Sequence, residues 1–183
     1  MKTIRKLLLL CLFGMISMGA WAYDFYATYN GKVIYYSITS RTAPYTVEVA
    51  KQGSYEYEGD ISIPSTVTYD GKTYAVERIG AEAFCLCKKI TSISMPSSIT
   101  SIGRMAFCNC PNMLSVNFPS SVTKIEDRAF YGCSSLTNVS LPYYLSNIES
   151  STFQDCSSLK SVTLPNSVHS LGDGAFYGCN YEV

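Results

Sequence analysis

The chain has 183 residues with 14 basic and 14 acidic side chains, and its net charge is zero. It carries no basic stripe of the kind that nucleic-acid-binding proteins use, so we expect no nucleic-acid partner. Its length allows one compact domain, or a short array of repeats with an appended module.

The segment 1–22 has the organisation of a secretory signal peptide. A basic start at 1–6 precedes a short apolar stretch, and Ala20-Trp21-Ala22 then supplies a small-x-small cleavage site. The stretch is too short and too early for a membrane span. We therefore predict cleavage after Ala22, secretion or display at the cell surface, and no membrane span in the mature chain. Cleavage removes Lys2, Arg5 and Lys6, so the acidic side chains of the mature chain outnumber the basic ones.

The segment 23–78 forms a tyrosine-rich module that holds most of the tyrosines of the chain. Asn30-Gly31 and Asp70-Gly71 each lie between two alternating apolar segments, which is the strongest short signal for a β-hairpin. We interpret the module as an antiparallel β cap that covers the open end of a repeat array. The expected strands are 24–29, 32–38, 45–50, 55–58, 66–69 and 72–76.

The segment 79–183 repeats with one fixed period, which is the step from Phe84 to Phe107. A period of this size predicts a solenoid in which each repeat buries its apolar face by stacking on its neighbours. Four units are complete and a fifth is partial, so the boundaries are 79–101, 102–124, 125–147, 148–170 and 171–183. Three residue types mark the period: Phe84, Phe107, Phe130, Phe153 and Phe176; Cys87, Cys110, Cys133, Cys156 and Cys179; Pro96, Pro119, Pro142 and Pro165.

Each repeat is expected to contain one short strand and one tight turn. In the third repeat, the segment 136–141 alternates as a strand that Pro142 ends, since proline cannot donate to a ladder. The segment around Ala129-Phe130 predicts a single helical or 3₁₀ turn on the opposite side. Strands of successive repeats then stack in parallel, about 4.8 Å apart. The inward side chains of this repeat are expected to be Ile125, Ala129, Phe130, Cys133, Leu136, Val139, Leu141 and Leu145.

The unit Ile-Gly-x-x-Ala-Phe-x-x-Cys-x-x-Leu-x-x-Val-x-Leu-Pro resembles the BspA-type (Treponema pallidum-type) leucine-rich repeat of bacterial surface proteins. The segment 59–74 is similar to the segment that leads into the repeats of such proteins. The resemblance implies a leucine-rich-repeat solenoid, a secreted or surface-displayed protein with an adhesive or protein-binding role, and no catalytic residues. This chain departs from the family pattern because it stops mid-repeat, with no sorting or anchoring segment after Val183. The fifth repeat ends before its own strand, so we expect the strand at 159–164 to be an open edge that favours self-association.

The cysteines allow more than one interpretation. The pairs Cys85-x-Cys87 and Cys108-x-Cys110 resemble zinc ligands. We favour a structural interpretation instead, because Cys87 and Cys110 belong to the five-fold column, where a thiol acts as a small buried hydrophobe. Parallel side chains in that column disfavour disulfides. Cys85 and Cys108 lie in a variable, outward column, and a disulfide between them remains an alternative to two free thiols. The lone His169 has no base partner, and we expect no metal, cofactor or catalytic site.

The outward side chains of the expected sheet form a flat face that is rich in hydroxyl groups and nearly uncharged. Solenoids commonly bind along such extended sheets, although the face is equally consistent with a merely solvated surface. The candidate binding residues are Thr91, Ser92, Ser94, Ser115, Asn117, Thr137, Asn138, Ser140, Lys160, Ser161 and Thr163.

The sequence thus favours an exported, non-enzymatic leucine-rich-repeat protein that binds proteins or surface glycans, in the manner of an adhesin. One alternative is a structural spacer, or a fragment of a longer surface array. Another is an accessory or inhibitor of an exported enzyme, with the tyrosine-rich module as the interacting part, since tyrosine suits interfaces.

Overall fold

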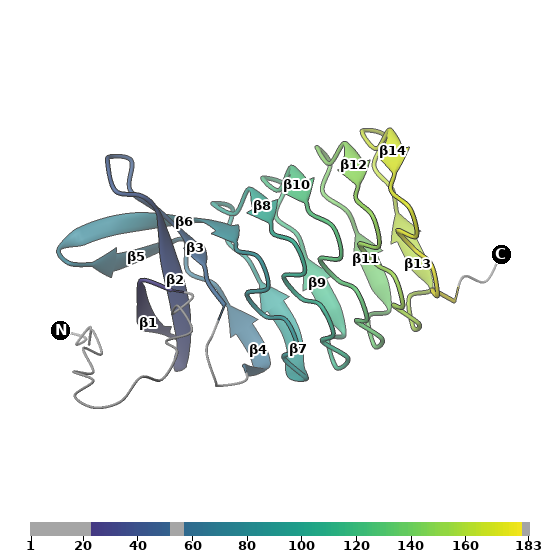
Figure 1. Ribbon diagram of the computed structural model, residues 1–183, viewed down its shortest axis with the longest axis horizontal. Coiled ribbons are helices and arrows are strands. Elements are labelled where there is room, and N and C mark those ends of the chain that lie inside the picture. The colour runs from purple at the N-terminus through teal and green to yellow at the C-terminus, as the bar shows by residue number, and fades with distance from the viewer. Residues whose placement is uncertain (1–22, 52–56, 181–183) are drawn as a thin grey trace, which may run out of the picture.

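The computed structural model describes residues 23–51 and 57–180. The signal peptide predicted for 1–22, and part of the strand predicted at 55–58, lie outside the described residues. The described chain is an elongated series of coils that a small sheet caps at the N-terminal end (Figure 1). Its strands are β1 Phe25–Tyr29, β2 Lys32–Ser40, β3 Thr46–Val49, β4 Glu58–Ser62, β5 Thr66–Tyr69, β6 Lys72–Ile79, β7 Lys89–Ser94, β8 Ser101–Ile102, β9 Ser115–Asn117, β10 Lys124–Ile125, β11 Asn138–Ser140, β12 Asn147–Ile148, β13 Ser161–Thr163 and β14 Ser170–Leu171.

Both predicted hairpins are present in the cap. β1 pairs with β2 and β5 pairs with β6, both antiparallel, around turns whose asparagine and aspartate adopt φ of 48° and 50°. β2 pairs with β3 in the same antiparallel sense. The pairing of β3 with β6 is parallel, which the sequence did not predict.

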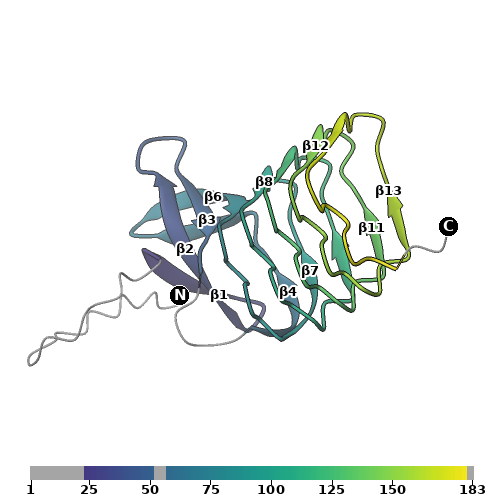
Figure 2. The ribbon, with the colours of Figure 1, turned by 45° about the vertical axis from the view of Figure 1, so that its right-hand side comes forward.

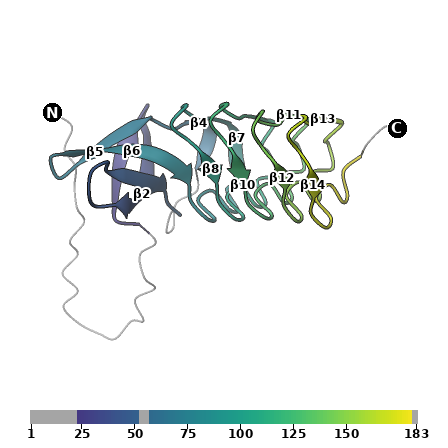
Figure 3. The same ribbon diagram turned by 90° about the horizontal axis from the view of Figure 1, so that it is seen from above.

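The cap continues directly into the repeats. β6 pairs in parallel with β8, and β4 pairs in parallel with β7, so two cap strands begin the two strand ladders of the solenoid. The register of β4 places Ile61 opposite Ile93 and Ser62 opposite Ser94, so β4 takes the place of the strand of an incomplete repeat before the first full one. Seen from above, the cap and the repeats share one long axis (Figure 3).

Every coil contributes one strand to each of two ladders, and the coils lie one behind another (Figure 2). The first ladder runs through β4, β7, β9, β11 and β13, and it contains the predicted strands in shortened form. The second runs through β6, β8, β10, β12 and β14. Sequence reasoning missed the second ladder, because its strands in the repeats are too short to show alternation.

The third side of each coil is a chain of tight turns, and the expected helical or 3₁₀ turn is not present in the described repeats. Two positions in each repeat have positive φ, which prevents the chain from curling into a helix. Adjacent turns are joined by hydrogen bonds, such as the Phe107 amide to the Ala129 carbonyl at 2.8 Å. The positive-φ positions are Glu82, Met105, Arg128, Ser151 and Gly174, and Leu86, Asn109, Gly132, Asp155 and Gly178.

The core is the column of phenylalanines that the period predicted. Neighbouring rings are stacked, with centroid separations of 5.1 to 5.5 Å and interplanar angles of 5° to 10°. Tyr57 of the cap closes the column by contacting Phe84, with the ring centroids 4.9 Å apart. All the inward side chains predicted for the third repeat are buried.

Both strand ladders are interrupted at one joint, between the strands of the second repeat and those of the third. β9 and β11 belong to separate sheets, and so do β10 and β12. Elsewhere the coils are linked, as by the Thr123 amide to the Thr100 carbonyl at 3.0 Å and the His169 amide to the Ser146 carbonyl at 2.9 Å. In the described chain no corresponding bond joins Ser146 to Thr123. We call this joint the seam.

Candidate functional site

The predicted binding residues lie on one face, along the first ladder. The in-register pairing aligns Ser92 with Ser115, and Asn138 with Ser161, in one column. A second column holds Ser94, Asn117, Ser140 and Thr163. Most of these side chains are exposed, and Thr91 and Ser92 are half-buried. The seam divides the face between Asn117 and Ser140. The structure thus brings the predicted residues together, in two halves.

A carboxylate that the sequence reasoning missed lies at the N-terminal end of this face. Asp60 of β4 is paired with Ser92, and its Oδ1 accepts hydrogen bonds from the Ser92 hydroxyl at 2.7 Å and from the Thr91 hydroxyl at 2.8 Å. These two bonds lower the pKa of Asp60. A carboxylate therefore lies at the end of the face next to the cap, where Lys32 also lowers its pKa and Lys89 lies 3.5 Å from Glu58.

The second ladder also exposes polar side chains, and these are charged near the cap. Its outward column holds Arg78, Ser101 and Lys124 in register, followed by Asn147 and Ser170 beyond the seam. Glu126 contacts Arg78 at 3.6 Å and Lys124 at 2.9 Å. Burial opposes ionisation of Glu126, but hydrogen bonds from the Lys124 ammonium and the Arg104 amide outweigh it, so its pKa is lowered.

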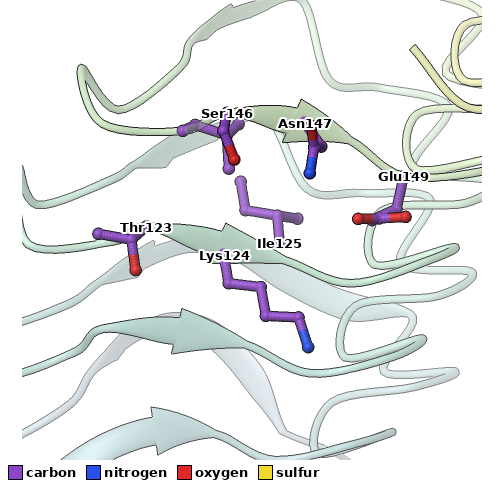
Figure 4. Close-up of a pocket in the computed structure, with 7 residues that line it drawn as sticks. Thr123, Lys124, Ile125, Ser146, Asn147 and Glu149 are labelled. Atoms are coloured by element: carbon purple, nitrogen blue, oxygen red, sulfur yellow. The ribbon is translucent and has the colours of Figure 1, made fainter. Parts of the chain in front are cut away.

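The seam opens a pocket of about 330 Å³ on the second ladder. Figure 4 shows Thr123 and Lys124 at β10 and Ser146 and Asn147 at β12, with the side chain of Ile125 between the two. The lining is polar at the rim and apolar at the base: Thr123, Lys124, Ile125, Leu145, Ser146, Asn147 and Glu149. No cue in the sequence marked this pocket, because it results from a missing pairing rather than from a residue motif.

All the cysteines in the described residues are free thiols. The column thiols are held inward, as when Cys133 donates to the Phe107 carbonyl at 3.1 Å. Burial raises the pKa of Cys156 to about 12. The outward pair differs from the prediction in one respect, since Cys108 is buried and only Cys85 is partly exposed. The Cys108 sulfur accepts a hydrogen bond from the Asn109 side-chain amide at 3.4 Å.

The described residues contain no group of three or more His, Cys, Asp or Glu side chains arranged to hold a metal ion. His169 is exposed on the second ladder, as its place in the repeat predicted. No helix in the described part of the chain has the length and apolar character needed to cross a membrane.

The repeats match the family model of the BspA type leucine-rich repeat region, in six copies over residues 77–182. This match covers more than half of the chain, so the protein belongs to the BspA-type leucine-rich-repeat family. No curated protein matches the chain.

Solved structures give the same assignment. A leucine-rich-repeat protein of T. pallidum is 30% identical, with a TM-score of 0.66 over 79% of this chain and 64% of its own. A leucine-rich cell-surface protein of Faecalibacterium prausnitzii is 28% identical, with a TM-score of 0.60 over 85% of this chain and 47% of its own. The pneumococcal vaccine antigen PcpA shares the fold at 23% identity and a TM-score of 0.66, over 87% of this chain and 49% of its own. The chain thus spans just under two thirds of the first protein and about half of the others.

Proposed function

We propose that this chain is an exported, non-enzymatic protein that binds a protein or a surface glycan through the polar face of the first ladder. The observation that carries the proposal is the in-register alignment of small hydroxyl and amide side chains within the strand pairs β7–β9 and β11–β13, on the two sides of the seam. A neutral surface of short side chains loses little side-chain entropy when it is covered, and it offers both donors and acceptors.

Membership of the family supports a binding role, and the relative from F. prausnitzii is named as a cell-surface protein. The predicted signal peptide supports export. The aligned side chains run over four strands of successive repeats, which favours a partner that lies along several repeats over a small ligand in a pocket.

The experiment is a matched pair of charge-and-bulk variants, tested by surface plasmon resonance against immobilised matrix proteins and cell-surface glycans. Ser115→Arg with Asn138→Arg places two long cations at the centre of the proposed face, and both native side chains are exposed. We expect a loss of affinity of about tenfold or more, as for the centre of an interface.

The control is Ser101→Arg with Ser170→Arg on the other ladder, which should leave binding unchanged. Equal losses in both variants would place the contact elsewhere. Failure of the unmodified chain to bind any of these surfaces would favour a structural spacer.

A further inference from the structure

Cys85 and Cys108 occupy equivalent positions in the first two repeats, as Phe84 and Phe107 do. Backbone hydrogen bonds fix the two coils on either side of them: the Phe84 amide donates to the Ala106 carbonyl at 2.8 Å, and the Leu86 amide to the Cys108 carbonyl at 2.7 Å. Chain segments joined by backbone hydrogen bonds, as these two turns are, lie about 4.8 Å apart, which is within the range of Cα separations that disulfides span, about 4.4–6.8 Å. The two thiols lie near enough for each to shift the pKa of the other.

The column cysteines have the same spacing but a different environment. Cys133 donates to the Phe107 carbonyl at 3.1 Å, and Cys156 donates to the Phe130 carbonyl at 3.2 Å. Each of these sulfur atoms therefore faces a backbone oxygen of an earlier repeat. The Cys108 sulfur, by contrast, accepts a hydrogen bond from the Asn109 side-chain amide at 3.4 Å, and its thiol and that of Cys85 shift each other's pKa across the joint between two repeats.

We propose that Cys85 and Cys108 form a disulfide between the first two repeats when the protein meets a disulfide oxidant such as oxidised glutathione. Cys85 is partly exposed, so its thiolate attacks first, forms a mixed disulfide and releases one glutathione thiolate. The Cys108 thiolate then attacks the Cys85 sulfur and releases the second glutathione. The two protein thiols lose two protons and two electrons, and the oxidant is reduced to two glutathione thiols.

The surroundings of the pair set the rate of this reaction. Burial raises the pKa of both thiols, that of Cys108 to about 11. Since the thiolate is the attacking species, oxidation should be faster at about pH 9 than at neutral pH. The charged and titratable side chains that act on the pair are Glu82, Lys51, Arg128, Tyr131 and Cys110.

The test is to incubate the purified chain with oxidised glutathione, alkylate the remaining thiols and map the peptides by mass spectrometry without reduction. We expect a Cys85–Cys108 linkage and the loss of two titratable thiols per chain. Cys133 and Cys156 should be alkylated only after unfolding. Absence of the linkage, or a linkage of either residue to another cysteine or to a second chain, would overturn the proposal.

Two variants test the order of attack. Cys108→Ser should stop at a mixed disulfide, with one glutathione bound to Cys85. Cys85→Ser should gain much less glutathione, because Cys108 is buried. Cys133→Ser is the matched control and should leave the Cys85–Cys108 linkage intact. Equal modification of the first two variants would contradict the mechanism, and the result with the unmodified chain decides the linkage even if a variant fails to fold.

Discussion

The side chains of one repeat depend on the backbone of the repeats before it. Each column cysteine from Cys110 onward donates its thiol proton to the carbonyl of a phenylalanine in an earlier repeat. The phenylalanine rings meanwhile stack on one another along the same axis. The fixed period of the sequence therefore reflects contacts that pass from each repeat to the next, and no repeat is complete without a neighbour.

Phe130 is the residue on which the core depends most. Its side chain is fully buried, it stacks on Phe107 and Phe153, and the ring of Phe118 meets its edge. We predict that Phe130→Ala lowers the free energy of unfolding by about 3–5 kcal/mol, as for other large core aromatics. Chemical denaturation followed by circular dichroism measures the loss.

Phe176→Ala is the control for this prediction, because its ring is only partly buried in the last repeat. Phe176→Ala should lower the free energy of unfolding clearly less than Phe130→Ala does. Equal losses, or a loss below about 1 kcal/mol at Phe130, would mean that the ring column does not carry the stability that its burial implies.

At the level of elements, the two strand ladders and the turn ladder behave differently at the seam. The turns of the second and third repeats stay joined, for example by the Asn109 amide to the Tyr131 carbonyl at 2.7 Å. The strands there are not paired. Phe118 gives a physical reason for the missing strand pairing. It replaces the Met or Leu that other repeats have at this position, and its larger ring reaches forward to Phe130, with the ring centroids 5.6 Å apart.

We predict that the backbone amides at the seam exchange their hydrogen with solvent faster than the amides at the other joints between repeats. The Ser146 and Glu149 amides should exchange faster than those of Glu126 and His169, which donate to the preceding coil at 3.0 and 2.9 Å. Phe118→Leu should close the seam and slow exchange at Ser146 and Glu149. Mass-spectrometric or NMR hydrogen exchange gives the comparison, and uniform rates at all joints would show that the seam does not weaken the ladder.

The sequence predicted those elements that a side-chain pattern marks. The hairpin turns at Asn30 and Asp70, the phenylalanine column and the first-ladder strands all carry such patterns, and the structure confirms them. The second ladder, the chain of tight turns and the seam depend instead on backbone conformation and on how neighbouring coils meet. The glycine, asparagine and aspartate residues at 109, 132, 155, 174 and 178 were the available signal for the turns, since these residue types favour positive φ.

The candidate face was predictable in the same way, because alternation along each strand separates outward residues from buried ones. All the candidate residues lie together along the first ladder. Asp60 was missed because the strands expected in this region, 55–58 and 66–69, left it between them, whereas β4 includes it. Its role at the end of the face appears only from the pairing of β4 with β7.

At the scale of the whole molecule, the two ends of the solenoid differ. At the N-terminal end, β4 and β6 pair with the first strands of the repeats, and Tyr57 covers the first phenylalanine. At the other end, β13 and β14 are the last strands of their ladders in the described chain. The apolar side chains of Leu164 and Leu171 are 46% and 57% exposed there, whereas the equivalent Leu141 and Ile148 are buried.

We predict that this chain associates with itself through that end in a concentration-dependent manner, because an unpaired strand edge with apolar neighbours recruits another chain. Sedimentation velocity over a range of concentrations measures the association. Leu164→Lys with Leu171→Lys should weaken it, since two like charges would then meet across the contact. Tyr143→Lys with Tyr144→Lys is the control, because these exposed residues lie in the corner between β11 and β12. A chain that stays monomeric, with β13 amides as protected as those of β11, would contradict the prediction and would mean that this end is closed by other contacts.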